Sequence, residues 1–181
     1  MIFFTSDLHI GHDKDFIWKA RGFNSIEEHD THILLNWNSI ISPEDTVYIL
    51  GDLCMGGNEA EWNRIYYVLN GNIKFIRGNH DTEAKIERYV TRYNMEDLGL
   101  AALFFYSKKK KFYLSHYPTL VGNYQEKRFF WNLSGHNHSS DAFVNGDGCV
   151  YNVAMDAHNC MPVSIEQIIK DIEKYNQKKE K

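Results

Sequence analysis

The stretch Ile2-Phe3-Phe4-Thr5-Ser6-Asp7-Leu8-His9-Ile10-Gly11-His12 decides how this chain is expected to fold. Its apolar beginning, Ile2–Thr5, predicts a buried strand, and the polar residues after it predict a loop at the carboxyl end of that strand. Two further apolar runs, Thr46–Leu50 and Ile73–Ile76, have the same form. In α/β sheets ligands bind outside the carboxyl ends of the strands, so the polar residues after such runs are the first candidates for a functional site.

Helix-like segments separate these three runs. The segment Ser25–Glu28 has the form of a capping box and predicts a helix that continues to about Ile41. Asn58 is expected to cap a second helix that ends near Leu69, before an Asn-Gly pair. A third helix is expected over Glu83–Tyr93.

The second half of the chain is richer in strands. Ala102–Tyr106 and Lys111–Ser115 are expected to form a hairpin, and a second capping box at Ser164 predicts a helix to about Tyr175. Three more strands are expected, at Phe129–Leu133, Ala142–Val144 and Val150–Ala154. The alternation predicts a single α/β domain over residues 1–181, with helices covering two faces of a layered sheet.

The composition is that of an ordinary soluble globular protein, with 43% apolar and 24% charged residues. A net charge of −4 argues against a protein built to coat nucleic acid. The sequence contains neither an apolar stretch long enough to span a membrane nor a basic segment typical of a secretory signal. Its cysteines, Cys54, Cys149 and Cys160, are few and widely spaced, which favours a reducing compartment. We therefore expect a cytoplasmic protein that does not enter membranes.

Five polar clusters each follow a strand-like run. If those strands point the same way, their loops converge on one rim of the sheet. Carboxylate and amide oxygens combined with imidazole nitrogens suit a pair of ions such as Mn²⁺, Fe, Co²⁺, Ni²⁺ or Zn²⁺ better than Ca²⁺ or a thiolate site. The clusters are Asp7-Leu8-His9-Ile10-Gly11-His12, Gly51-Asp52, Gly78-Asn79-His80-Asp81, Ser115-His116 and Gly135-His136-Asn137-His138.

The ordered series DxH, GD, GNHD, H and GHxH resembles the calcineurin-like metallophosphoesterases. All five motifs occur in the order of that family, from Asp7 to His138, over about three quarters of the chain. The resemblance implies a layered α/β/β/α fold, in which helices flank a central mixed β sandwich. It also implies two divalent metal ions, with Mn²⁺ the expected ion, and hydrolysis of a phosphate ester by in-line attack of a hydroxide that both metals bind.

The resemblance further implies a ligand role for seven residues by their positions in the motifs. One residue, Asp52, would bridge the two metals. The first metal would be bound by Asp7, His9 and His138. The second metal would be bound by Asn79, His116 and His136.

Catalytic and substrate-binding roles follow for residues beside these ligands. In the family the histidine of GNH touches the phosphate, so His80 is the candidate general acid or stabiliser of the transition-state charge. Asp81 would orient the His80 ring. His12 and Arg77 are candidates for contact with the substrate, and the alternative for His12 is that it starts a helix or loop. Asp156, in a second Asp-x-His pattern, is more simply a loop residue near the rim.

The motifs leave the substrate open. The partner is expected to be a phosphodiester or a phosphomonoester that could be nucleotide-like, and the chain has no dedicated nucleic-acid-binding domain. The segment Tyr117–Trp131 is expected to wall the site. The alternative function is a non-catalytic metal-binding scaffold of the same fold, and the intact ligand set together with His80 favours the enzyme. The sequence indicates no oligomeric state.

Overall fold

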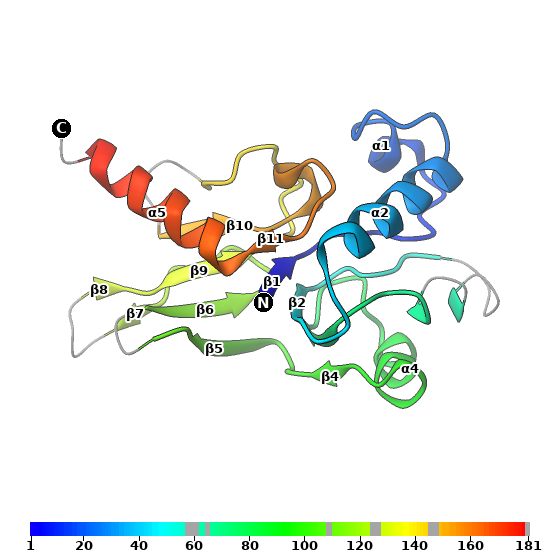
Figure 1. The fold of residues 1–181 in the computed structure, drawn as a ribbon, viewed down its shortest axis with the longest axis horizontal. Helices are drawn as coiled ribbons and strands as arrows, with labels where there is room; N and C mark the ends of the chain where they lie inside the picture. Colours follow the sequence, from blue (N-terminus) through cyan, green and yellow to red (C-terminus); the bar gives the residue numbers. More distant parts are fainter. Residues whose placement is uncertain (57–61, 64–65, 108–109, 124–127, 145–148, 180–181) are drawn as a thin grey trace.

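The computed structural model describes residues 1–56, 62–63, 66–107, 110–123, 128–144 and 149–179. Two mixed sheets lie against each other and helices flank them (Figure 1). The predicted layered α/β fold with a central mixed β sandwich is therefore confirmed. The predicted helix from Asn58 to Leu69 lies largely outside the described residues.

The first sheet has the strand order β11-β1-β2-β3-β4. Strands β1 to β4 run parallel, and β11 pairs antiparallel with β1. The first two strands have the predicted bounds, and the third begins one residue earlier than predicted. The bounds are Ile2–Thr5 for β1, Thr46–Leu50 for β2, Asn72–Ile76 for β3, Glu96–Asp97 for β4 and Val163–Ser164 for β11.

The second sheet has the order β10-β9-β6-β5. Strands β6, β9 and β10 are parallel, and β5 pairs antiparallel with β6 as the predicted hairpin requires. A separate ribbon joins β7, Gly122–Asn123, to β8, Arg128–Phe129. The bounds in the second sheet are Ala101–Phe105 for β5, Lys111–Ser115 for β6, Trp131–Ser134 for β9 and Val150–Asn152 for β10.

Two predicted strands are not single regular strands in the structure, and the predicted strand Val150–Ala154 ends at Asn152. The segment Phe129–Leu133 is not one strand, because the chain changes partners at Phe130, whose N–H donates to the Val121 carbonyl over 2.9 Å. The segment Ala142–Val144 is not a regular strand either and makes one isolated bridge to β10. In both places a short apolar run has the composition of a strand, whereas its pairing depends on distant residues that the run does not specify.

The side chains of β1 show how the sheet separates two cores. Phe3 faces the core beneath the first layer of helices, and Phe4 faces the core between the two sheets. The Phe4 ring meets that of Phe104, from β5 of the second sheet, edge-on at 5.3 Å between centroids. Both faces of β1 are therefore buried, which explains its continuous apolar sequence.

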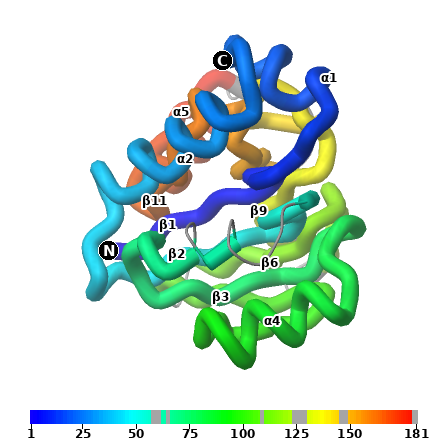
Figure 2. The backbone as a smooth tube through the Cα atoms, turned by 90° about the vertical axis from the view of Figure 1, so that its right-hand side faces the viewer, coloured from blue at the N-terminus to red at the C-terminus, as the bar shows by residue number. Residues whose placement is uncertain are grey.

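Helices α2, Ile26–Ile40, and α4, Glu83–Tyr93, cover the outer face of the first sheet (Figures 1 and 2). Ser25 caps α2 as predicted, because its hydroxyl oxygen accepts from the N–H of Glu28 at 3.2 Å. Helix α5, Ile165–Lys179, packs on the core between the sheets and continues beyond the predicted end. None of the helices in the described ranges has the length and apolarity that a membrane crossing requires.

The carboxyl ends of strands from the two sheets meet at one place. Ser6, just after β1, forms a parallel bridge with Ala154, which follows β10. The Ser6 carbonyl also accepts from the N–H of Met155 at 3.1 Å. The rim predicted from five converging loops is thus built by three strands of the first sheet and two of the second.

Candidate metal centre

Hydrogen bonds that involve the backbone tie the motif loops to one another. The N–H of Asp7 donates to the Gly51 carbonyl over 3.0 Å, and the N–H of Gly135 donates to the His116 carbonyl over the same distance. The N–H of His136 donates to the Asp7 carboxylate at 2.9 Å, so the last motif is held directly against the first. The structure brings all seven predicted metal ligands together at this junction.

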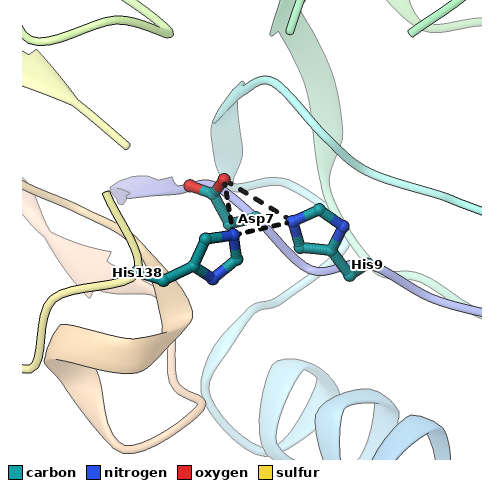
Figure 3. A group of neighbouring side chains, drawn as sticks. All are labelled: Asp7, His9 and His138. Carbon is teal, nitrogen blue, oxygen red and sulfur yellow. Dashed lines mark hydrogen bonds and ion pairs between the residues drawn. The ribbon is translucent and has the colours of Figure 1, made fainter. Parts of the chain in front are cut away.

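Asp7, His9 and His138 form the first group of potential ligands (Figure 3). The Nε2 atoms of His9 and His138 are 3.1 Å apart. They lie 3.7 and 3.8 Å from Oδ1 of Asp7. Asp7 and His9 are buried, whereas the His138 side chain is 33% exposed. Of the three side chains, that of His138 is therefore the most exposed to solvent.

Asn79, His116 and His136 form a second group. Oδ1 of Asn79 lies 2.8 Å from Nε2 of His116 and 3.1 Å from Nδ1 of His136. The two ring nitrogens are 3.2 Å apart. Three strands, β3, β6 and β9, deliver these side chains from two sheets.

Asp52 lies between the two groups. Its Oδ2 is 3.8 Å from Nε2 of His9 and 3.5 Å from Nε2 of His116. Its Oδ1 accepts from the backbone N–H of His80 at 2.9 Å. One oxygen of this buried carboxylate thus faces both groups while the other is held by the GNHD loop, which is the placement a bridging ligand needs.

The hydrogen-bonding pattern fits cations at these positions. The Leu50 carbonyl, 2.8 Å away, can only accept, so Nδ1 of His116 carries the proton and Nε2 of the neutral ring presents a lone pair to its neighbours. Oδ1 of Asp7 is buried and has no hydrogen-bond partner among the described residues. Ligands at right angles with bonds of about 2.1 Å are about 3.0 Å apart, close to the separations within the second group. The residues present therefore fit divalent ions.

Backbone strain is concentrated at the same place. Among the described residues, eight other than glycine have a positive φ, and five of these are predicted metal ligands. A left-handed conformation costs roughly 1–2 kcal/mol for such residues, so it persists where the surrounding structure requires it. The five are Asp7, His9, Asp52, His136 and His138, with φ between 49° and 72°.

Two motif glycines allow carboxylates to approach the backbone. A Cβ on Gly78 would lie 2.2 Å from Oδ1 of Asp52, and a Cβ on Gly135 would lie 2.1 Å from Oδ2 of Asp7. Neither position tolerates a side chain without displacing an acidic residue of the centre.

The charges of the centre depend on burial and on each other. Burial alone would raise the pKa of Asp7, but its contact with His9, the neighbouring His116 imidazole and the Ser6 hydroxyl outweigh burial and lower that pKa. Burial raises the pKa of the Cys54 thiol to about 12. Asp7 is therefore available as an anionic ligand, whereas Cys54 is a poor nucleophile.

His80 and His12 both line the cleft in front of the centre. The rings of His80 and His9 are 5.8 Å apart between centroids. Nδ1 of His12 accepts from the N–H of Lys14 at 3.1 Å, which leaves Nε2–H of the neutral ring to donate toward a ligand. The predicted substrate-side positions of these two histidines agree with the cleft that the structure shows.

Asp81 does not lie where the prediction put it. Its Oδ2 accepts from the backbone N–H groups of Asp52 and Gly78, at 2.9 and 2.8 Å. Its Oδ1 accepts from the Tyr89 hydroxyl at 3.3 Å. The carboxylate therefore fixes the loops that carry Asp52 and Asn79, and none of its hydrogen bonds within the described residues reaches the His80 ring.

Arg77 is also placed differently. Its guanidinium donates to both carboxylate oxygens of Asp97, over 2.5 to 3.2 Å, and to Glu83 over 3.2 Å. Within the described part of the chain, Arg77 does not line the cleft. The position of Arg77 next to the GNHD loop favours a substrate contact. In the structure its side chain instead pairs with Asp97 and so connects the end of β3 to β4.

Two residues outside the five motifs, Arg21 and Asp156, contact the first ligand group. Asp156 accepts from Nδ1 of His138 at 3.1 Å, and Arg21 forms an ion pair with Asp156 at 2.8 Å. The Asp-x-His pattern after β10 was a signal for Asp156. Nothing local marked Arg21, because its partner is 135 positions away.

The cleft has one apolar wall. It is formed by Phe16, Ile17 and Ala20, in and just after the short helix α1, Asp15–Trp18. The Phe16 side chain is 65% exposed and packs edge-on against His12 at 5.3 Å between centroids. An organic group on the substrate would find hydrophobic contact at this wall, opposite the polar centre.

Known proteins resemble this chain over nearly its whole length. The sequence model of calcineurin-like phosphoesterases matches residues 1–179. An uncharacterised protein of Methanocaldococcus jannaschii is 34% identical over 178 residues, which cover 96% of this chain and 92% of that protein. The gene 66 protein of Mycobacterium phage D29 is 29% identical, with 95% and 97% covered. The crystal structure of a protein of unknown function from Aquifex aeolicus superposes with a TM-score of 0.68 at 25% identity, covering 94% of this chain and 98% of that one.

Proposed function

The chain belongs to the calcineurin-like phosphoesterase family, and we propose that it is a dinuclear metal-dependent hydrolase of phosphate esters. The observation that carries this proposal is the position of Asp52 between two complete ligand groups, with His80 beside them at the cleft. Asp7, His9 and His138 would hold one ion, and Asn79, His116 and His136 the other. Mn²⁺ is the proposed ion because the donors are mixed oxygen and nitrogen without thiolate.

Two divalent ions in these positions would supply the Lewis acidity that activates water and offsets the charge of the phosphoryl group. The protein's own contribution is positioning and proton transfer. His80 is proposed to protonate the leaving oxygen or to donate a hydrogen bond to the phosphoryl group. His12 is proposed to donate a second hydrogen bond through Nε2, and Asp81 to hold the loops of Asp52 and Asn79 in place.

The apolar wall supports an ester with an organic leaving group. In this arrangement the phosphoryl group lies over the two ligand groups and the leaving group lies against Phe16 and Ile17. Phosphodiesters and phosphomonoesters, including nucleotide-like ones, both fit that description.

The test compares wild type with His80→Ala after metal removal and reconstitution with Mn²⁺. Hydrolysis of bis-p-nitrophenyl phosphate and p-nitrophenyl phosphate is measured together with the number of bound Mn²⁺ ions. His80→Ala is expected to keep the wild-type number of ions and to lose about 10²- to 10⁴-fold in kcat, the usual contribution of a general acid. His32→Ala, a matched change at an exposed histidine on α2, is expected to keep both.

Two results would count against the proposal. Turnover by wild-type protein without any metal would exclude a metal-dependent hydrolase. Two tightly bound ions without turnover of either ester, or of a panel of nucleotide esters, would favour the metal-binding scaffold instead.

A further inference from the structure

An ion pair with little solvent exposure lies beside the first ligand group. Nε of Arg21 donates to Oδ1 of Asp156 over 3.1 Å, and an Nη donates to Oδ2 over 2.8 Å. The two side chains are 2% and 13% exposed. A two-point contact of this kind fixes the plane of the carboxylate as well as its distance.

That carboxylate holds the His138 ring. Oδ2 of Asp156 accepts from Nδ1 of His138 at 3.1 Å. The proton is thereby kept on Nδ1, so Nε2 presents its lone pair toward Asp7 and His9 (Figure 3). Without Asp156 the ring would be free to rotate and to place its proton on either nitrogen.

The same guanidinium also contacts the loop backbone between the other two members of the group, Asp7 and His9. Arg21 donates to the Asp7 carbonyl over 2.6 Å and to the Leu8 carbonyl over 3.2 Å. The first carbonyl belongs to Asp7 itself, and the second belongs to the peptide bond that joins Leu8 to His9. One buried cation therefore connects all three members of the first group.

Contacts behind Arg21 keep it in place. Nε2 of His29 lies 2.9 Å from an Nη of Arg21, and because arginine can only donate, this nitrogen accepts. Nδ1 of His29 then donates to Asp30 over 2.8 Å. The other oxygen of Asp30 accepts from the Gly11 N–H at 2.9 Å, so the chain of contacts returns to the first motif loop.

The second ligand group is held by other means. Nδ1 of His116 donates to the Leu50 backbone carbonyl. Within the described residues, the hydrogen bonds of Arg21 and Asp156 do not reach Asn79, His116 or His136. A defect in the ion pair should therefore act on one group and spare the other.

We propose that Arg21 and Asp156 are positioning residues that set the metal affinity of the Asp7–His9–His138 group and leave that of the Asn79–His116–His136 group unchanged. This inference rests on the proposed dinuclear centre and goes beyond it, because it assigns a selective role to two residues outside the ligand set.

The experiment titrates metal-free protein with Mn²⁺ by isothermal calorimetry and counts bound ions by elemental analysis. Wild type is expected to bind two ions. Asp156→Asn and Arg21→Lys are each expected to weaken one of the two by about 10- to 100-fold, the usual effect of losing a group that orients a metal-binding histidine, and to leave the other unchanged. Asp171→Asn is the matched control, because that carboxylate accepts from the Tyr151 hydroxyl away from the centre.

A double-mutant cycle separates positioning from a general loss of structure. If Asp156 acts through His138, then Asp156→Asn has no further effect on Mn²⁺ affinity in a His138→Ala background. The inference would be overturned if Asp156→Asn lowered Mn²⁺ affinity as much in the His138→Ala background as in wild type. It would also be overturned if the variants weakened Mn²⁺ binding equally at both sites, or at neither site. A wild type that binds no Mn²⁺ would instead overturn the dinuclear centre itself.

Discussion

Replacing Gly135 by alanine tests how closely the end of β9 packs on the centre. The added Cβ would lie 2.0 Å from Oγ of Ser6 and 2.1 Å from Oδ2 of Asp7. Ordinary contact begins near 3.4 Å, so the Asp7 carboxylate has to move by more than about 1 Å. Gly135 does not have a positive φ, so alanine adds no backbone strain of its own.

The cost follows from the contacts that Asp7 would lose. Oδ2 accepts from the Ser6 hydroxyl at 2.6 Å and from the His136 N–H at 2.9 Å. Hydrogen bonds to a charged group contribute roughly 1.5–3 kcal/mol each, so losing both lowers the free energy of unfolding by about 3–6 kcal/mol. With a urea m-value of about 2 kcal/mol/M, the midpoint falls by about 1.5 M or more.

The assay is urea unfolding of the metal-free protein, followed by Mn²⁺ titration. Gly99→Ala is the control, because a Cβ there meets nothing within 4 Å and only the positive φ of 77° opposes it, at roughly 1–2 kcal/mol. Gly135→Ala is expected to be clearly less stable than Gly99→Ala and to lose Mn²⁺ affinity. A variant within about 1 kcal/mol of wild type that binds Mn²⁺ normally would refute the packing argument.

Three further predictions concern residues around the centre. Arg77→Ala is expected to change KM and kcat less than about twofold, because Arg77 pairs with Asp97 and Glu83; a large rise in KM would restore it as a substrate contact. Phe16→Ala is expected to raise KM for aryl esters several-fold while kcat changes little, and equal effects on methyl and aryl esters would contradict the leaving-group wall. Burial lowers the pKa of His158 below its usual range, so the unfolded state takes up the proton first and stability falls as the pH drops below about 6.5. His158→Gln should therefore make the urea midpoint less dependent on pH between pH 7.5 and 5. An unchanged pH dependence would show that His158 does not cause the loss of stability.

The local features of the fold were predictable from the sequence because short segments carry them. The strand Ile2–Thr5 is apolar on both faces, and the Ser25 cap precedes an amphipathic helix, so each segment specifies its own structure. The motif residues were also predictable, because each follows a strand. The place where the motif residues meet depends on how the two sheets pack together. Only the family resemblance indicated that packing.

The interpretations that differed from the structure concern competition between partners. Asp81 was expected to bind the His80 ring, but two backbone N–H groups and the Tyr89 hydroxyl take its oxygens. Arg77 was expected at the substrate, but the Asp97 carboxylate on the neighbouring strand binds its guanidinium. A sequence shows which groups an acid or base can bind, whereas the choice among them depends on contacts between distant segments.

The most direct test of the central claim is the anomalous diffraction of crystals grown with Mn²⁺. We predict two peaks, one bounded by Asp7, His9 and His138 and the other by Asn79, His116 and His136, with Asp52 contacting both. A single peak, or ions bound elsewhere while these side chains contact one another directly, would contradict the dinuclear centre on which the proposed function depends.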